Sequence, residues 1–450
     1  MELKKFKLKN KKQTFIIIFS IFIGLILGYF LFGNSYAFYE EKKDFDVING
    51  TVDDPGDIYF AYYIDGTISR SMPTQNTGYT LDETKSNCNN GVIPTWDNAG
   101  WKFIGDYHNY SATDNTRTKC TLYFNKTSKT VSTALGNIEV NTYTPDFTKS
   151  ACDDESCESH EKGIYETTDY DGNPTYYYRG SVENNYVKFA GYYWRIIRIN
   201  SNGSIRIIYD GTSAHANGEA SEDRQYGTSQ FNSYFNDNMY LGYMYTEDNA
   251  HGTTTSSTIK PNVDEFYVKL LTNYSSSLDL DIGFCGDRST LNLQSGVGTK
   301  SVITYNKGYL RVEESTPTLI CENINDYYTT PVSVLSGNKA LTYPIGLITV
   351  DEMILAGHAG GIFDGKYNHM KYNKTSYLTI GTSFWTITPA GGYNPFGYNG
   401  CYAYIFYIGN SGFIDEGGGD NPFGIRPVIN IRSDVTIIGS GTMTNPYVVN

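Results

Sequence analysis

The pattern of apolar and polar positions is clearest at residues 191–211, "GYYWRIIRINSNGSIRIIYDG". Two runs of Ile, Arg and Tyr flank Asn202-Gly203, and Asn-Gly is one of the strongest signals for a hairpin turn. The alternation predicts two antiparallel strands with one buried face. That face would hold Trp194, Ile196, Ile205 and Ile207 or Ile208, while the heads of Arg195 and Arg198 would reach water. The alternative for these two arginines is a catalytic or anion-binding role.

Similar strand-like runs recur towards the C-terminus, at residues 383–389, 401–415, 423–431 and 446–449. Helical spacing is rare. One stretch, residues 262–271, has its apolar positions on one helical face, namely Val263, Phe266, Tyr267, Leu270 and Leu271. A second helix should begin at Thr349, which forms a capping box with Glu352, and end at Gly357. The chain is therefore expected to be α+β and β-rich, with few short helices.

A different pattern occupies residues 14–33, which are almost entirely apolar and carry no charge. Such a helix would be about 30 Å long, enough to cross a membrane. The lysines before it, six of them in the first dozen residues, should stay in the cytoplasm, so that the rest of the chain faces outward. We expect residues 1–37 to be a basic tail and an uncleaved signal anchor; the alternative is a signal peptide cleaved after Ala37.

Composition divides the remainder into four segments. Residues 38–56 form a polar stalk, 57–127 a small β domain, 128–160 a linker and 161–450 a second domain. The linker is rich in Ser and Thr and then acidic. Its Asp153, Asp154 and Glu155 leave two interpretations open, a solvated loop or a calcium site.

Seven cysteines fit an exported chain, because disulfides persist outside the cytoplasm. Pairing by proximity predicts three bridges, Cys88–Cys120, Cys152–Cys157 and Cys285–Cys321, and leaves Cys401 as a free thiol. No Cys-x-x-Cys pair or His cluster suggests a metal.

The net charge and the absence of known catalytic motifs argue against several classes of function. The formal net charge of −13 argues against a nucleic-acid partner. No His-Glu-x-x-His or Gly-x-Ser-x-Gly word is present, and only His358 and His369 lie near Cys401 in sequence. We therefore expect no catalytic residue, no metal and no cofactor. Asp415, Glu416 and Asp420 could hold an ion, but a wet loop is the favoured interpretation.

Residues 391–423 concentrate Tyr, Asn, Gly and Ser, the composition of many recognition surfaces. Tyrosine faces can also stack on sugar rings. The predicted ligand-binding residues are Tyr393, Asn394, Tyr398, Asn399, Tyr402, Tyr404, Tyr407 and Asn410. Alternation within 401–408 should turn some of these tyrosines inward. The alternative is a set of turns that binds nothing.

From residue 176 onward, several short sequence motifs in a fixed order resemble those of a known family. Among them are "NNYVKFAGYYWRIIRIN", "LTYPIGLITVDE", "FWTITP" and "FGIRPVINI". The chain resembles exported or membrane-anchored surface proteins of gut Firmicutes and mollicute-like bacteria. Those proteins end in a C-type-lectin-like domain, related to formylglycine-generating enzymes and to retroelement-diversified variable proteins. The resemblance implies this fold for 161–450, a framework role for the 191–211 hairpin, and a Gly-x-Arg-Pro word at Gly424–Pro427.

The expected function is that of a single-pass surface protein, an adhesin or receptor without enzymatic activity. Its partner would be a glycan or a protein on another cell surface. One alternative is a structural envelope or fimbria-like protein. The other is an enzyme of the formylglycine-generating type, for which the cysteine pair of the copper-using relatives is missing, since this region holds only Cys401. A further hypothesis is that residues 391–423 are diversified by a retroelement.

Overall fold

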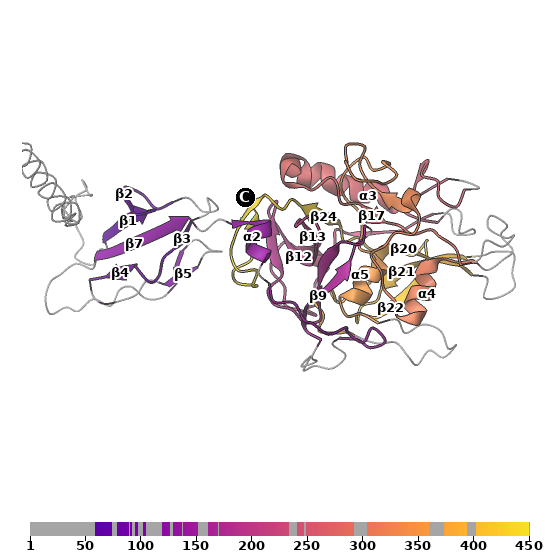
Figure 1. Ribbon diagram of the computed structural model, residues 1–450, viewed down its shortest axis with the longest axis horizontal. Helices are drawn as coiled ribbons and strands as arrows, with labels where there is room; N and C mark the ends of the chain where they lie inside the picture. Colours follow the sequence, from indigo (N-terminus) through magenta and orange to yellow (C-terminus); the bar gives the residue numbers. More distant parts are fainter. Residues whose placement is uncertain are drawn as a thin grey trace, which may run out of the picture. The chain divides into compact units, whose positions relative to one another are not determined.

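The computed structural model shows a β-rich chain with few short helices (Figure 1). It describes residues 59–73, 79–89, 91, 95–97, 102–104, 119–126, 129–136, 138–151, 161–169, 171–233, 241–246, 249–291, 304–359, 373–393 and 402–449. These all belong to one compact unit, residues 56–450. No helix within the described ranges is both long and apolar enough to cross a membrane. The predicted anchor at 14–33 and the predicted Cys152–Cys157 bridge lie outside those ranges.

A small sheet with the strand order β2-β1-β7-β3 occupies the N-terminal part of this unit, and β4 also pairs with β7. Its strands are β1 (Tyr59–Ile64), β2 (Thr67–Ser69), β3 (Tyr79–Leu81), β4 (Asn87–Cys88) and β7 (Lys119–Lys126). The first and last strands of the predicted domain, β1 and β7, lie side by side inside the sheet and run parallel to each other. The predicted Cys88–Cys120 disulfide is present and joins β4 to β7. A separate hairpin pairs β5 (Thr95–Asp97) with β6 (Lys102–Ile104).

The largest sheet has nine strands and joins both ends of the C-terminal part. Its main order is β24-β13-β12-β11-β26-β25-β8, and β10 links β9 to β12. The strands are β8 (Lys129–Thr130), β9 (Gly163–Thr168), β10 (Pro174–Arg179), β11 (Tyr186–Phe189), β12 (Tyr192–Ile199), β13 (Ile205–Gly211), β24 (Val428–Ile431), β25 (Thr436–Ile438) and β26 (Tyr447–Val449).

The predicted hairpin is confirmed as β12 and β13, which pair antiparallel around a turn with Gly203 at φ +79°. Trp194, Ile196, Ile205, Ile207 and Ile208 are all fully buried, as expected. The prediction for the arginines was wrong, because Arg195 is 0% exposed and Arg198 only 8%. Both faces of these strands are covered, so the alternating arginines are buried in ion pairs instead of lying on an open face.

A second sheet of six strands follows the order β14-β23-β20-β21-β22, with β18 paired to β20. Its strands are β14 (Thr228–Ser229), β18 (Thr304–Tyr305), β20 (Phe384–Tyr393), β21 (Tyr402–Ile408), β22 (Ile414–Gly418) and β23 (Phe423–Gly424). Two short hairpin-like pairs lie apart from it, β15 (Met244–Tyr245) with β16 (Thr255–Ser256) and β17 (Phe284–Cys285) with β19 (Tyr327–Tyr328).

The helices are short. The predicted helix near 262–271 is confirmed as α3 (Ile259–Phe266), continued by a π-helical turn at Tyr267–Leu271. α4 (Lys307–Glu314) and α5 (Val350–Leu355) pack against β20 (Figure 1). The capping box of Thr349 and Glu352 forms as predicted. Short 3-10 turns complete the chain at Glu222–Arg224, Thr272–Ser277 and Ile324–Asp326.

Part of the segment that composition assigns to a linker contributes to the large sheet. β8 pairs with β25, and α2 (Val131–Leu135) follows it with Val131 and Leu135 buried. Further along, the backbone N–H of Ala151 donates to the carbonyl of Gly357 at 2.8 Å. The described residues between 129 and 151 are therefore packed onto the C-terminal part of the chain.

Candidate functional site

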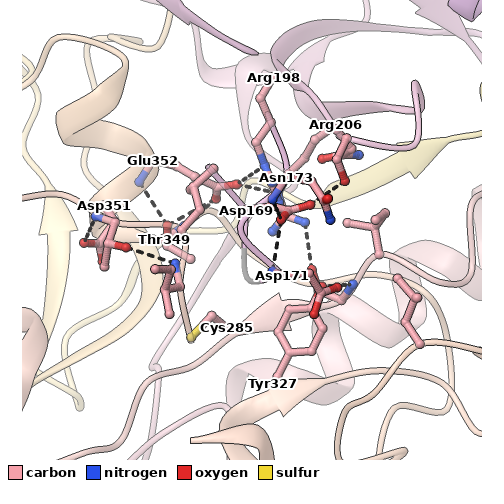
Figure 2. A pocket seen from close by; sticks show the side chains of 18 of the residues that line it. Asp169, Asp171, Asn173, Arg198, Arg206, Cys285, Tyr327, Thr349, Asp351 and Glu352 are labelled. Carbon is pink, nitrogen blue, oxygen red and sulfur yellow. Dashed lines mark hydrogen bonds and ion pairs between the residues drawn. The ribbon is translucent and has the colours of Figure 1, made fainter. Parts of the chain in front are cut away.

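A polar cavity of about 490 Å³ lies where several segments, distant in sequence, converge (Figure 2). The turn between β9 and β10 and the tip of the β12–β13 hairpin form one side. The other side comes from α4, the start of α5, and the segments around residues 282–287, 318–320 and 335–336. Its charged lining residues are Asp169, Asp171, Arg198, Arg206, Asp287, Arg311, Asp351 and Glu352.

Two arginines meet one carboxylate in the cavity wall. The Nε atoms of Arg198 and Arg206 lie 3.0 and 2.7 Å from Oε1 of Glu352. The other oxygen of Glu352 accepts the backbone N–H of Thr349 at 3.0 Å, which fixes the side chain at the start of α5. Burial by itself would raise the pKa of Glu352, but the two guanidiniums and this N–H hold it below its usual range.

Each of the two arginines makes one side-chain hydrogen bond to the described residues. Arg206 donates from Nη1 to the carbonyl of Gly283 at 3.1 Å and lies over the ring of Phe284. Its burial lowers its pKa to about 10. Arg198 makes a single hydrogen bond to the described residues, from Nε to Glu352. Its Nη1 and Nη2 groups are therefore left over on a side chain that lines the cavity.

A second set of charged residues lines the cavity around Asp351, the residue before Glu352. Arg311 binds Asp351 through two bonds, Nε to Oδ1 at 2.7 Å and Nη2 to Oδ2 at 2.9 Å. Its Nη1 lies 2.6 Å from Oδ2 of Asp287. Burial raises the pKa of Asp287, whose backbone has a positive φ of 28°. Here one guanidinium contacts two carboxylates, whereas at Glu352 one carboxylate contacts two guanidiniums.

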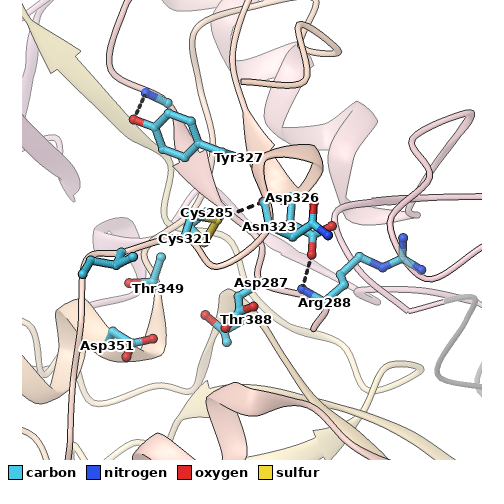
Figure 3. The surroundings of a disulfide bond; sticks show 12 residues. Cys285, Asp287, Arg288, Cys321, Asn323, Asp326, Tyr327, Thr349, Asp351 and Thr388 are labelled. Atoms are coloured by element: carbon cyan, nitrogen blue, oxygen red, sulfur yellow. Dashed lines mark hydrogen bonds between the residues drawn. A yellow bond between two sulfur atoms is a disulfide. The ribbon is translucent and has the colours of Figure 1, made fainter. Parts of the chain in front are cut away.

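The Cys285–Cys321 disulfide supports the wall between these two groups (Figure 3). It confirms the predicted pair and ties β17 to the segment that carries Thr318, Leu319 and Ile320 into the lining. The loop that contributes Leu335 and Ser336 to the lining is also held in place by hydrogen bonds. Asp281 Oδ1 accepts the N–H of Val334 at 2.7 Å, and Lys339 Nζ donates to the carbonyl of Ser333 at 2.6 Å.

The sequence predicted none of these cavity residues as ligand contacts. Glu352 stands out in the sequence only as part of a capping box, and Arg198 and Arg206 only as polar positions in a hairpin. Arg198 and Glu352 are separated by 154 residues. The only available signal was the presence of arginine at positions that a strand pattern would bury.

The described members of the predicted Tyr/Asn surface do not form one patch. Tyr393 and Tyr402 pair at one end of the β20–β21 hairpin, while Asn410 lies in the turn beyond the other end of β21. At about 3.3 Å per residue, Tyr402 and Asn410 are roughly 25 Å apart. Asn394, Tyr398 and Asn399 lie outside the described residues.

Tyr404 and Tyr407 point to opposite faces of β21, because their positions differ by an odd number, three. The ring of Tyr407 packs 4.4 Å from that of Phe423, and its hydroxyl donates to Asp415 at 2.9 Å. Tyr407 is therefore largely a packing residue, one of the inward-facing tyrosines that alternation predicts. Tyr404 is half-buried against the main core.

Asp415 and Glu416 are not in a wet loop, as the sequence suggested, but half-buried in β22. Glu416 is close enough to Tyr309 on α4 to contribute to the raised pKa of that tyrosine, which is due mainly to burial. Burial, reinforced by the charge of Asp415, raises the pKa of Glu416 to about 7. Asp420 is exposed in the following turn.

This shift predicts a pH dependence of stability. Unfolding restores an ordinary pKa near 4.5, so the folded state loses stability as the pH rises from about 4.5 through 7. Glu416→Gln should match the wild type at pH 4.5 and exceed its free energy of unfolding by about 1–3 kcal/mol above pH 7. Urea unfolding across this pH range measures the difference. The exposed Glu314→Gln is the control, and an equal gain in both variants would contradict the assignment.

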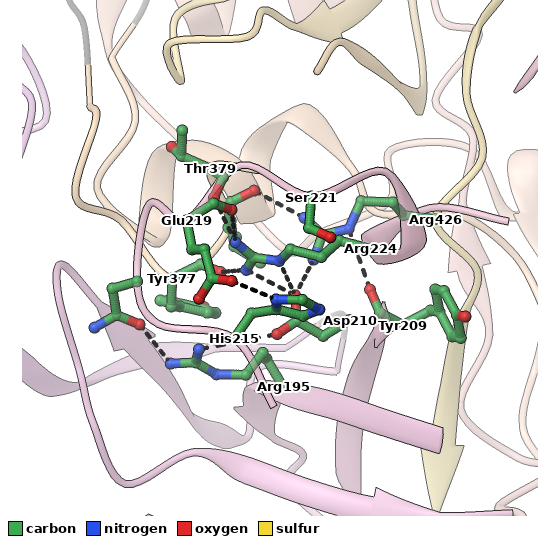
Figure 4. Close-up of polar contacts among 12 residues, drawn as sticks. Arg195, Tyr209, Asp210, His215, Glu219, Ser221, Arg224, Tyr377, Thr379 and Arg426 are labelled. Carbon is green, nitrogen blue, oxygen red and sulfur yellow. Dashed lines mark hydrogen bonds and ion pairs between the residues drawn. The ribbon is translucent and has the colours of Figure 1, made fainter. Parts of the chain in front are cut away.

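Away from the cavity, three buried arginines surround Asp210 (Figure 4). Arg224 Nη2 and Arg426 Nη2 lie 2.8 and 2.9 Å from its Oδ1, and Arg195 Nη1 lies 4.0 Å from Oδ2. Arg426 also donates to the carbonyls of Tyr209 and Leu378. This arginine belongs to the Gly-x-Arg-Pro word, and in the structure it ties the C-terminal strands to β13.

His215 lies beside this network and at first resembles part of a catalytic triad. Its Nδ1 is 3.0 Å from Oε1 of Glu219, and its Nε2 is 3.3 Å from the hydroxyl of Ser213. However, Nε2 is also 2.9 Å from Oδ1 of Asp223. Because each ring nitrogen faces a carboxylate, neither is available to take a proton from Ser213. The arrangement is that of an ion-pair network.

His358 also has both ring nitrogens engaged. Nδ1 is 2.6 Å from the carbonyl of Gly412, and Nε2 is 2.9 Å from the hydroxyl of Ser376. Since a carbonyl can only accept, Nδ1 carries the proton and Nε2 accepts from Ser376. Complete burial lowers the pKa of this histidine to about 4. It links the β21–β22 turn to the segment before β20, and Cys401 and His369 lie outside the described residues.

Within the described parts of the chain, no group of three or more His, Cys, Asp or Glu side chains is placed to hold a metal ion. Asp153, Asp154 and Glu155, for which the sequence left a solvated loop or a calcium site open, lie outside those parts. A search of family models, of curated proteins and of solved structures finds no match to this chain.

Proposed function

We propose that this chain is an exported, non-enzymatic ligand-binding protein whose C-type-lectin-like domain takes a polar ligand in the cavity beside Glu352. The observation that carries the proposal is the cavity itself, into which charged and amide side chains from well-separated segments converge. Residues 14–33 would anchor the protein in the cell membrane, with the domain outside. The partner would be a glycan or protein of another cell surface.

The size and construction of the cavity support binding. Ligand sites generally enclose roughly 300–1,000 Å³, and this cavity of about 490 Å³ falls within that range. Its walls are held by a disulfide and by ion pairs between buried side chains. A preformed site of this kind spares the ligand the entropic cost of ordering the protein. The two disulfides also fit a protein that works outside the cytoplasm.

The charges in the walls favour binding over chemistry. A general base needs a side chain that is free to accept a proton. Glu352 and Asp351 are instead both committed to arginines at hydrogen-bonding distance. The envelope-protein alternative requires no cavity, so occupancy of the cavity distinguishes the two functions.

The test uses full-length protein on arrays of glycans and of extracts from bacterial and host surfaces. Ser336→Trp places a large side chain at an exposed position of the cavity lining, where the fold should tolerate it. Ser276→Trp, at an exposed position that does not line the cavity, is the matched control. We expect saturable binding that Ser336→Trp reduces at least tenfold and Ser276→Trp leaves unchanged.

A third variant separates the cavity from the Tyr/Asn segment. Replacement of Tyr393, Tyr398, Tyr402 and Tyr404 by Ser should leave binding intact if the ligand enters the cavity. Binding that this variant loses and Ser336→Trp keeps would instead place the ligand on the tyrosines. Failure of the intact protein to bind any array component would contradict the proposed function and favour the structural alternative.

A further inference from the structure

We infer that the ligand carries a carboxylate, which the unused Nη1 and Nη2 groups of Arg198 bind as a bidentate pair. This inference rests on the proposed function, since it names the chemical class that the same cavity accepts. Arg198 lines the cavity, is only 8% exposed, and donates to the described residues through Nε alone. The two remaining nitrogens of a guanidinium form a planar fork that matches the two oxygens of a carboxylate.

The buried arginines of this protein differ in how completely they are paired: Arg195 Nη1, Arg206 Nε and Arg311 Nη1 make no hydrogen bond to the described residues, although each lies near a carboxylate. Arg426 and Arg224 are both fully buried, and each uses all three side-chain nitrogens on Asp210 or on carbonyl groups. Arg198 instead keeps two nitrogens without a partner among the described residues, at a cavity wall where an external acceptor can reach them.

The local charge points the same way. Arg198 and Arg206 share the single carboxylate of Glu352, so this group of three buried side chains holds one surplus positive charge. Surplus positive charge attracts a ligand of opposite sign. Glu352 already takes up Nε, and the ligand would complete the coordination of the guanidinium.

The remaining charges argue for a singly charged carboxylate over phosphate. The lining contains five carboxylates, those of Asp169, Asp171, Asp287, Asp351 and Glu352, against three arginines. This excess repels any anion, and it repels a doubly charged phosphate group about twice as strongly as a singly charged carboxylate. A carboxylate on a molecule rich in hydroxyl or amide groups would instead find acceptors in Asp171 and Asn173 at the mouth, and apolar contact with Ile282 and Leu335.

Two sources supply this chemistry, acidic sugars and the C-terminus of a peptide. The experiment titrates full-length protein with oligosaccharides of glucuronic acid and with the same chains after reduction of their carboxyl groups to alcohols. A parallel titration uses tripeptides with a free C-terminus and their C-terminal amides. We expect binding of the carboxylate form in one of the two series, which identifies the source, and binding roughly 10- to 100-fold weaker for its neutral counterpart.

Variants connect this preference to Arg198. Arg198→Gln should abolish the preference for the carboxylate form, and Arg198→Lys, which keeps the charge and lacks the fork, should retain only part of it. Arg432→Gln removes an exposed arginine paired with Asp434 and is the charge-matched control; it should change nothing. Thermal melting checks that each variant is folded.

Two results would overturn the inference. One is equal binding of the acidic and neutral forms that Ser336→Trp abolishes, which would leave the proposed function standing with a neutral ligand. The other is a carboxylate preference that survives in folded Arg198→Gln protein, which would place the anion elsewhere. Absence of any binding, on the arrays as well as in these titrations, would count against the proposed function and the inference together.

Discussion

Asp210→Asn should lower the free energy of unfolding by about 3–5 kcal/mol, the largest effect that we expect from a single substitution in this protein. Asp210 is fully buried and is the nearest carboxylate to three buried guanidiniums. The amide keeps the shape of the side chain and removes its charge. Arg195, Arg224 and Arg426 would then face one another without compensation in a medium of low polarity.

The loss should be cooperative, because the network connects distant parts of the chain. Arg426 reaches Asp210 from the segment before β24, and Arg224 reaches it from the 3-10 turn at 222–224. Chemical unfolding monitored by tryptophan fluorescence measures the effect, since Trp194 is buried on the neighbouring strand β12. Asp434→Asn, which removes an exposed carboxylate next to Arg432, is the control and should leave the midpoint unchanged. Equal midpoints for wild type and Asp210→Asn would show that the arginines are satisfied without the charge.

Removal of the Cys88–Cys120 disulfide should destabilise the small sheet by about 2–5 kcal/mol. Among the described residues, the buried apolar core of this sheet is small; apart from the two cysteines it consists of Leu81, Leu122 and Phe124. A core of this size contributes little stability, so the crosslink between β4 and β7 carries a large share. We therefore expect the double variant with Cys88→Ala and Cys120→Ala to unfold in this region first.

Hydrogen exchange followed by mass spectrometry resolves where protection is lost. Peptides covering β1 and β7 should exchange faster in the Cys88/Cys120 variant, while those covering β12 and β13 should keep wild-type rates. The double variant with Cys285→Ala and Cys321→Ala is the matched control, because it removes a bridge of similar span from the cavity wall. Faster exchange of β12 and β13 in the Cys88/Cys120 variant would mean that this bridge stabilises more than its own sheet.

The sequence predicts secondary structure correctly where a short stretch determines its own conformation. The Asn202-Gly203 turn favours positive φ, and the flanking Ile and Trp residues identify the buried face, so the hairpin could be predicted from 21 residues. The capping box at Thr349 is equally local. The Cys88–Cys120 and Cys285–Cys321 pairs were predicted from proximity because each closes a short loop between neighbouring strands or segments.

The prediction from the sequence was wrong where the burial of a residue depends on which elements cover its strand. Alternation at Arg195 and Arg198 is compatible with an open face, but other elements cover both sides of β12, so the arginines need buried partners. Those partners are Asp210 in the next strand and Glu352 on a distant helix. The cavity could not be predicted for the same reason. Its walls come from segments whose proximity is a property of the complete fold.

Amino-acid composition did not predict how the tyrosines and asparagines of residues 391–423 are arranged. Tyr, Asn and Gly between 391 and 423 suggested one recognition patch, yet Tyr404 and Tyr407 lie on opposite faces of β21 and Asn410 lies beyond its far end. Composition counts residues without regard to the two-residue period of a strand. Tyr407, which packs on Phe423 and donates to Asp415, shows that the same residue type can also be part of the core.

The position of the Cys285–Cys321 bridge affects the stage of maturation at which the cavity is fully assembled. Thr318, Leu319 and Ile320 immediately precede Cys321, so oxidation fastens one side of the cavity directly to β17. A newly made chain in a reducing compartment lacks this fastening, and its binding site would be incompletely assembled during synthesis. Competence to bind would then be acquired only after translocation and thiol oxidation.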